Sequence, residues 1–104
     1  MKLIRDHTPD LLPNSTRPAY NHEEFLLLLR LKLVEEASEV AASTSTEEFI
    51  SEMADLWEVF QENLKWKHVS LEMIIQVARA KKDKKGGYDE RKVLFFDPPE
   101  NKHK

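Results

Sequence analysis

Two amphipathic helical patterns, separated by a four-residue polar break, constrain this chain more than any other feature. Apolar residues recur at intervals of three and four from Phe25 to Val40 and again from Phe49 to Leu64, as on one face of an α-helix. The break "STST" at residues 43–46 is long enough only to reverse the direction of the chain. The sequence therefore predicts an antiparallel helical hairpin.

Local signals place the ends of these helices. Asn21 is a favoured N-cap, and the helix that follows it runs to about Ala42. Ser45, with Glu48 three residues later, fits a capping box before a second helix over about 46–67. The predicted fold class is all-α.

A third helix follows Ser70 and ends in "KKDKKGG", where lysines and then glycines are typical of a helix C-terminus. Three prolines exclude one continuous helix over residues 1–20, although a short helical turn is expected at 9–12. We predict one all-α domain over 1–95 and a flexible polar tail over 96–104. The hairpin and third helix are expected to complete a four-helix-bundle-type core on oligomerisation.

Composition excludes several classes of protein. A chain of 104 residues with 34% charged residues and a net charge of -3 fits one soluble domain with no stable nucleic-acid binding. Without cysteine, neither a disulfide framework nor a thiolate metal site is possible. The longest apolar run is far too short for a membrane span, and no signal-peptide core is present, so we expect a cytoplasmic protein. A domain this small favours self-association.

Acidic residues on the two long helices lean toward the predicted packing faces. With Leu33 at the centre of the first face, Glu36 lies about 60° to one side and Glu39 about 120° on the same side. On the second helix, Glu52 lies about 40° from the centre of the face and Asp55 about 100° from it. Because the turn is short, Glu39 and Glu52 have comparable heights, and the two acidic pairs converge.

Converging carboxylates repel one another and lose hydration, so they either protonate or bind a cation. Hard divalent cations prefer carboxylate oxygens, and Mg²⁺ binds few carboxylates together with waters and substrate phosphates. The alternative is an ordinary solvated helix, on which Glu35 and Glu58 pair with Lys or Arg at helical spacing. From the residues alone, both interpretations stay open.

The acidic residues also form a spaced motif. Glu35, Glu36 and Glu39 are followed, after twelve residues, by Glu52 and Asp55. This E-E-x-x-E and E-x-x-D pattern resembles the signature of the all-α nucleoside triphosphate pyrophosphohydrolases. That group is the MazG-like superfamily, which also includes the phosphoribosyl-ATP pyrophosphohydrolases.

The flanking segments extend the resemblance to about residues 2–95. "KLIRDHTPDLL" near the N-terminus is similar to the "KLVRDKIPEII" opening of one branch of the family, and "KKDKKGGYDERKVL" resembles its "KRGGF" segment. One departure is His7, which stands where the opening usually has lysine. If that lysine contacts phosphate or base in relatives, its role is open here.

The resemblance implies Mg²⁺-dependent hydrolysis between the α- and β-phosphates of a nucleoside triphosphate, with Mn²⁺ as a substitute metal. It implies a homodimer or homotetramer with sites completed across subunits. The carried-over metal ligands are Glu36, Glu39, Glu52 and Asp55. Glu35 would bind a further metal or orient the attacking water.

Phosphate contacts must come from metals and basic side chains, because Gly86 and Gly87 are the only glycines and cannot form a Walker-type loop. Near these glycines and in the N-terminal arm, the candidates for phosphate or nucleotide binding are Lys2, Arg5, Lys84, Lys85, Tyr88 and Arg91. The alternative for the lysines is helix C-terminal electrostatics and solubility. Trp57, near Asp55, is a candidate for stacking on a base.

Three other functions are compatible with acidic residues on paired helices to different degrees. A di-iron bundle needs E-x-x-H pairs, which are missing here. A phosphoribosyl-ATP pyrophosphohydrolase stays open, although the arm favours cleansing of the nucleotide pool. A non-enzymatic interaction or regulatory module, whose acidic stripe binds a basic partner, also stays open.

Overall fold

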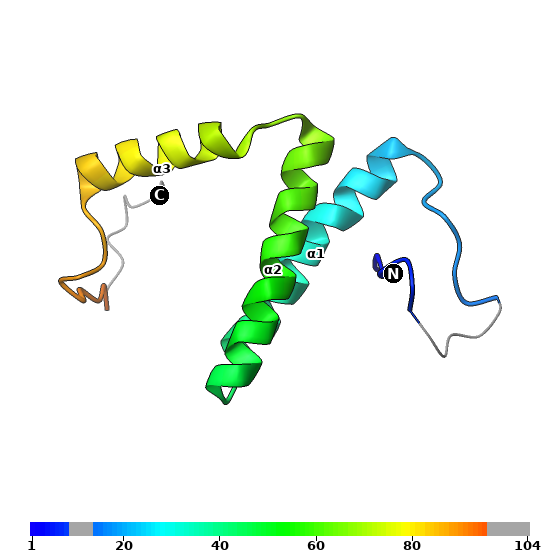
Figure 1. The fold of residues 1–104 in the computed structure, drawn as a ribbon, viewed down its shortest axis with the longest axis horizontal. Coiled ribbons are helices and arrows are strands. Elements are labelled where there is room, and N and C mark those ends of the chain that lie inside the picture. The colour runs from blue at the N-terminus through cyan, green and yellow to red at the C-terminus, as the bar shows by residue number, and fades with distance from the viewer. Residues whose placement is uncertain (9–13, 96–104) are drawn as a thin grey trace. The chain divides into compact units, whose positions relative to one another are not determined.

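The computed structural model describes residues 1–8 and 14–95, and within these ranges every regular element is a helix. The three helices in chain order are α1 (His22–Ala42), α2 (Thr46–Lys67) and α3 (Leu71–Lys85) (Figure 1). The predicted all-α class is confirmed for this part of the chain. The helical turn expected at 9–12 and the tail at 96–104 lie outside the described residues. No helix in the described ranges combines the length and apolarity needed to cross a membrane.

The chain divides into two compact units, Met1–Leu71 and Glu72–Lys104. The first unit contains the N-terminal arm and the hairpin of α1 and α2. The second contains nearly all of α3, along which Ile74 is half-buried and the other described side chains are exposed. All candidate metal ligands belong to the first unit.

Side-chain caps fix the start of each helix in the hairpin. Asn21 Oδ1 accepts a hydrogen bond from Glu24 N at 2.8 Å, and Ser45 Oγ accepts one from Glu48 N at 3.1 Å. Glu48 Oε1 accepts in return from Thr44 N at 2.6 Å, one residue earlier than a capping box predicts. These caps satisfy backbone donors that a helix leaves without an internal partner.

Removing the cap of α2 should destabilise the hairpin measurably. Ser45→Ala is expected to lower the free energy of unfolding by about 1 kcal/mol, because Glu48 N loses its acceptor. Urea denaturation measures the change. Ser51→Ala, at an exposed position within α2, is the control and should be neutral or slightly stabilising. Equal midpoints for the two variants would contradict the capping role.

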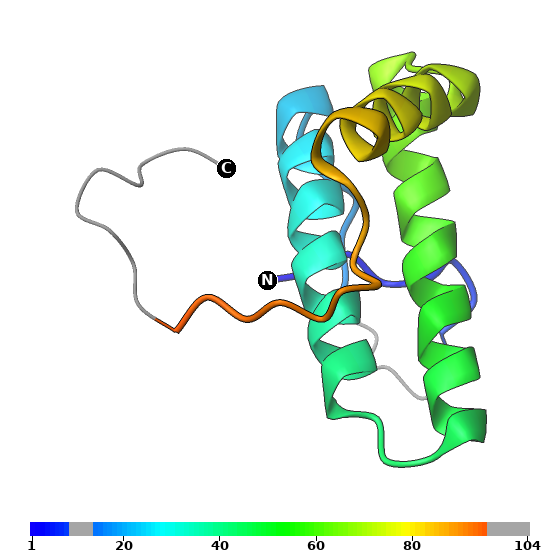
Figure 2. The same cartoon turned by 90° about the vertical axis from the view of Figure 1, so that its left-hand side faces the viewer.

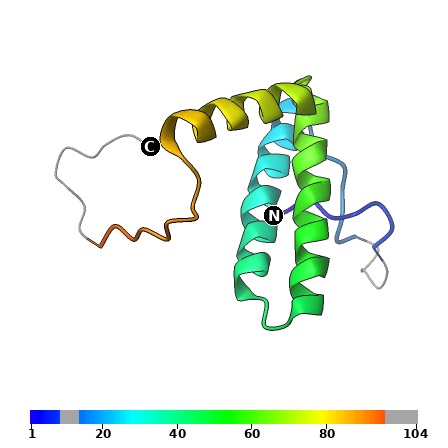
Figure 3. The same ribbon diagram turned by 60° about the vertical axis from the view of Figure 1, so that its left-hand side comes forward.

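α1 and α2 run side by side and antiparallel, joined by the turn at residues 43–45 (Figures 2 and 3). Asn63 Nδ2 on α2 donates to the backbone oxygen of Leu29 on α1 at 3.1 Å and also to Val59 O at 2.8 Å. At the open end of the hairpin, Phe25 and Trp66 meet edge to face with ring centroids 5.3 Å apart. The predicted hairpin is thus held by aromatic packing and by a polar link between its helices.

The packing face of α1 differs from the predicted one. Among the described residues, the buried side chains are Leu29 and Glu36, whereas Leu33 is half-buried and Ala37 is exposed. The expectation that Leu33 is the centre of this face is therefore wrong. Apolar residues occur all round the first half of α1, so a helical wheel gives no single direction there.

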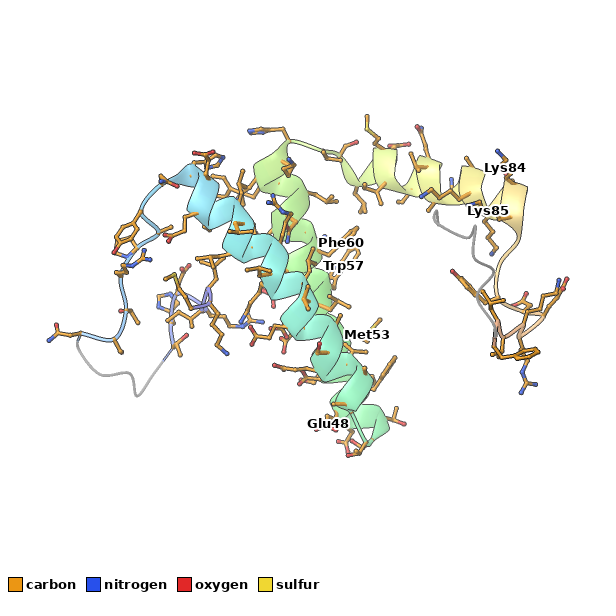
Figure 4. The ribbon with its side chains drawn as sticks, turned by 180° about the vertical axis from the view of Figure 1, so that it is seen from behind. Glu48, Met53, Trp57, Phe60, Lys84 and Lys85 are labelled. Atoms are coloured by element: carbon orange, nitrogen blue, oxygen red, sulfur yellow. The ribbon has the colours of Figure 1, made fainter. Side chains whose placement is uncertain are left out.

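A large apolar surface stays exposed on the hairpin. Phe49 begins the predicted apolar face of α2 and Met53 follows it four residues later, but their exposed fractions are 46% and 42%. Met53, Trp57 and Phe60 follow one another along α2 (Figure 4). On the two helices together, the exposed large apolar residues are Leu27, Leu31, Val34, Phe49, Ile50, Met53, Trp57 and Trp66. This part of the chain therefore buries little apolar area by itself.

Candidate metal centre

The hairpin brings all five predicted acidic residues into one group. Glu36, Glu52 and Asp55 each offer a carboxylate oxygen, and these oxygens lie within 4.8 Å of one another. Glu35, Glu36 and Glu39 form a second such set within the same limit. Glu36 belongs to both sets. We name the five residues Glu35, Glu36, Glu39, Glu52 and Asp55 the carboxylate cluster.

The spacing of the cluster approaches what a small divalent cation requires. Octahedral Mg²⁺ with oxygen ligands at about 2.1 Å places those oxygens roughly 3 to 4 Å apart. The carboxylate oxygens of each set lie within 4.8 Å of one another, so small side-chain rotations would bring them into that range. The donors are all carboxylates, which suit a hard cation such as Mg²⁺ or Mn²⁺.

Two oxygens in the cluster are buried without a hydrogen-bond partner among the described residues, namely Glu36 Oε1 and Glu52 Oε2. Glu36 is only 7% exposed. Buried polar atoms in proteins are nearly always paired, and an unpaired one calls for an ion, a water or a strained role. These oxygens come from facing helices, so the cluster has an inner pair of acceptors available for a cation.

The electrostatic surroundings hinder ionisation of the inner carboxyls. Burial raises the pKa of Glu36, and the neighbouring Glu39 raises it further. A hydrogen bond to the Glu39 carboxyl, together with burial and the surrounding negative charges, raises the pKa of Glu52 to about 7. A bound cation would reverse both effects, because it favours the charged form.

Repulsion among the carboxylates acts on a protein of modest stability. Carboxylate oxygens within 4.8 Å of one another repel when both groups are ionised, and a partly buried site screens that repulsion less than water does. Small domains are stable by only about 5–15 kcal/mol in total. The metal-free cluster therefore has to share protons or recruit cations.

On α1, Glu35 already has cationic partners, and we call it the outer carboxylate of this helix. Lys2 Nζ lies 3.0 Å from Glu35 Oε2, and Lys32 Nζ lies 3.2 Å from Glu35 Oε1 and 3.6 Å from Glu36 Oε2. The hydrogen bond from Lys2 is the main cause of the lowered pKa of Glu35. Lys32 was not singled out from the sequence, although its spacing of three and four from Glu35 and Glu36 is a usable signal.

On α2, one arginine pairs with Asp55 of the carboxylate cluster and with the neighbouring Glu58, which we call the outer carboxylates of this helix. Arg5 Nη2 donates to Asp55 Oδ1 at 2.8 Å and to Glu58 Oε1 at 2.7 Å, while Arg5 Nη1 donates to Glu58 Oε2 at 3.2 Å. This pairing lowers the pKa of Glu58. The suggestion that Glu58 pairs at helical spacing is wrong, because its partner is 53 residues away. No local pattern in the sequence indicates that contact.

The remaining predicted site residues stay predictions. Four of them are exposed and belong to the second compact unit: Lys84, Lys85, Tyr88 and Arg91. The two lysines lie at the end of α3 (Figure 4). Trp57 is 48% exposed and stacks on Phe60, with ring centroids 5.6 Å apart.

No protein-family profile, curated protein or solved structure matches the chain. Function is therefore inferred from the side chains described above and from the motif resemblance.

Proposed function

We propose that this protein is a Mg²⁺-dependent nucleoside triphosphate pyrophosphohydrolase that cleaves the α–β phosphate bond and releases a nucleoside monophosphate and pyrophosphate. The observation that carries the proposal is a pair of buried oxygens on facing helices, Glu36 Oε1 and Glu52 Oε2, which have no hydrogen-bond partner among the described residues and lie within the carboxylate cluster. The motif resemblance supplies the reaction class.

In this proposal the metal ligands are Glu36, Glu39, Glu52 and Asp55. Bound Mg²⁺ would supply Lewis-acid chemistry, by engaging phosphate oxygens and lowering the pKa of a coordinated water. Glu35 would orient the attacking water. Its lowered pKa keeps it an ionised acceptor but makes it a weak base, so positioning suits it better than proton abstraction.

Basic side chains would complete the substrate site. Lys2 and Arg5 already lie beside the carboxylate cluster, and their flexible stems would let them turn toward phosphates once substrate enters. Such cations neutralise charge that develops on the departing pyrophosphate.

Product identity tests the reaction. The purified protein is incubated with ribo-, deoxyribo- and modified nucleoside triphosphates, with Mg²⁺ or with EDTA, and pyrophosphate and orthophosphate are quantified separately. We expect pyrophosphate and the matching monophosphate, with Mg²⁺ only. A preference for modified bases would favour a house-cleaning role in the nucleotide pool. Orthophosphate with a diphosphate product would contradict cleavage at the α–β bond.

Two alternatives have distinct outcomes in the same assay. Turnover of phosphoribosyl-ATP alone would assign the chain to that branch of the family. A regulatory module that binds a basic partner is favoured by the fact that the outer carboxylates already accept Lys2 and Arg5. Such a module would turn over no nucleotide, and its binding would not require Mg²⁺.

We also propose that the functional form is a homodimer or homotetramer with a four-helix-bundle-type core. The support is the exposed apolar surface of the hairpin, combined with a single buried hydrophobic side chain, Leu29, among the described residues. A hairpin with so little core gains most of its missing apolar burial by packing on another copy.

A charge within this surface should disrupt assembly. Met53→Glu is expected to lower the mass measured by sedimentation equilibrium toward 12.2 kDa, because the new carboxylate would be desolvated at the interface. Gln61→Glu, at an exposed polar position of the same helix, is the control and should keep the wild-type mass. A wild-type protein that is monomeric at high micromolar concentration would contradict the proposed assembly.

A further inference from the structure

The N-terminal arm joins the two halves of the carboxylate cluster. Lys2 pairs with Glu35 on α1, and three residues later Arg5 pairs with Asp55 and Glu58 on α2. The blue N-terminal segment in Figure 2 crosses behind both helices. The arm and the hairpin belong to the same compact unit.

We propose that the arm is a displaceable strap, which neutralises Glu35 and Asp55 in the metal-free protein and opposes binding of the divalent cation, by direct competition at Asp55 and by its positive charge beside Glu35. This inference rests on the proposed metal site but concerns its regulation. Metal binding would release Lys2 and Arg5 from Glu35 and Asp55. The released cations would then be free to meet the phosphates of the substrate.

The geometry at Arg5 favours such an exchange. One side of its guanidinium holds Glu58 with two hydrogen bonds, at 2.7 and 3.2 Å, while a single bond of 2.8 Å reaches Asp55. Asp55 can therefore turn away by breaking one hydrogen bond, and Arg5 would leave Glu58 in a later step, when substrate phosphates replace that carboxylate. A cation bound by Asp55 would also repel the nearby guanidinium, so the two positive groups disfavour each other.

The exposure of the arm keeps the strap weak enough to open. The side chains of Lys2 and Arg5 are 63% and 61% exposed in their ion pairs. Exposed ion pairs are weak and screened by salt, so a divalent cation can displace them. Lys32, which lies on α1 itself and is only 16% exposed, would remain beside Glu35 and Glu36.

A different role for Arg5 predicts the opposite result. If Arg5 served to orient Asp55 for the metal, as outer-shell partners of metal ligands often do, its removal would weaken metal binding. A strap predicts tighter binding after removal, since the metal no longer displaces a competing cation. The sign of the change in affinity therefore distinguishes the two roles.

The test is a titration of the full-length protein with Mn²⁺ alone, in which electron paramagnetic resonance reports free metal. The double variant Lys2→Gln with Arg5→Gln should bind Mn²⁺ about 3- to 10-fold more tightly than wild type. Arg17→Gln is the matched control, because Arg17 also lies in the N-terminal arm and pairs with a helix α1 carboxylate, Glu24, at 2.9 Å, outside the cluster. Its Mn²⁺ affinity should stay within twofold of wild type.

A second measurement follows the arm directly. Backbone amides of residues 2–8 should exchange hydrogen faster when the wild-type protein is saturated with Mg²⁺ than in EDTA, because the strap opens. Unchanged or weaker Mn²⁺ binding by the double variant would overturn the strap. That result would leave pyrophosphate release by the wild type intact, so the function would stand.

The converse outcome is equally distinct. Tighter Mn²⁺ binding by the double variant, together with no turnover of any nucleotide by the wild type, would support the strap and count against the proposed enzyme. Failure of every form to bind Mn²⁺ at millimolar concentration would overturn the strap together with the metal site.

Discussion

Glu36→Gln should reduce Mg²⁺-dependent pyrophosphate release by more than about 100-fold, since loss of a ligand exceeds the 10- to 100-fold cost seen for outer-shell partners. Glu36 is shared by both carboxylate sets, and its Oε1 is buried without a partner among the described residues. The amide keeps the shape of the side chain but offers the metal a neutral and weaker ligand.

The same substitution should stabilise the metal-free protein. Burial and neighbouring charges raise the pKa of Glu36, so ionising this carboxyl in the folded state is unfavourable, and glutamine removes that cost. In EDTA at pH 8, we expect the melting temperature of Glu36→Gln to rise by several degrees. The opposite signs of the two effects separate a functional role from loss of folding.

Glu47→Gln is the matched control for this pair of measurements, because Glu47 is an exposed carboxylate near the start of α2 and outside the cluster. It should keep nearly all activity. Full activity of Glu36→Gln, or a loss of activity accompanied by unfolding, would contradict the assigned role.

The second large effect is a dependence of stability on pH that metal reverses. The pKa of Glu52 is raised from 4.5 to about 7 in the folded state. In the unfolded chain this carboxyl releases its proton near 4.5, so the folded state binds more protons between those values. Without metal, the contribution of Glu52 to the free energy of unfolding is therefore fully present below pH 4.5. This contribution is lost as the pH rises toward 7.

Other groups act in a separate range of pH. Arg17 lowers the pKa of Glu24 to about 2, and lysine or arginine partners lower the pKa values of Glu35 and Glu58. Their contributions to stability are present above 4.5 and are lost as pH falls below it. The decline between pH 5 and 7 thus belongs to the inner carboxyls.

Thermal unfolding at pH 5, 6, 7 and 8 checks this prediction. In EDTA the melting temperature should fall across the series, and Glu52→Gln should flatten most of the decline. With Mn²⁺ fixed at a hundred times the dissociation constant measured at pH 8, the folded state gains about 2.7 kcal/mol at that pH, and less at lower pH, where protons compete for the carboxyls. A wild-type melting temperature that rises with pH in EDTA would contradict the electrostatic account.

Helix positions could be predicted from the sequence because their signals are local. Asn21 and Ser45 accept the hydrogen bonds expected of N-caps, and α2 spans Thr46–Lys67 as predicted. Such signals depend on residues within three or four positions of one another, which the sequence displays directly.

The convergence of Glu36 with Glu52 and Asp55 could also be predicted, since a short turn fixes the relative heights of two antiparallel helices. The burial of Glu36 could not be predicted from the sequence. Its burial depends on which side of α1 meets α2, and the apolar residues around α1 leave that direction undetermined.

The contacts of the N-terminal arm with the helices could not be predicted from the sequence. Arg5 reaches Asp55 and Glu58 across 50 and 53 residues, and no periodicity relates positions so far apart. Lys2 is a predicted phosphate contact, and its ion pair with Glu35 was not foreseen from the sequence. A basic arm and an acidic cluster attract each other in general terms, but the choice of partners requires the fold.

The most direct test of the central claim is the location of bound metal. Crystals grown with Mn²⁺ give an anomalous difference map in which the ion is identified by its own scattering. We expect a peak bounded by Glu36, Glu52 and Asp55, with carboxylate oxygens at about 2.0–2.3 Å. A fully ordered cluster without a peak at millimolar Mn²⁺, or with manganese only at surface carboxylates elsewhere, would contradict the assignment of these residues as a metal centre.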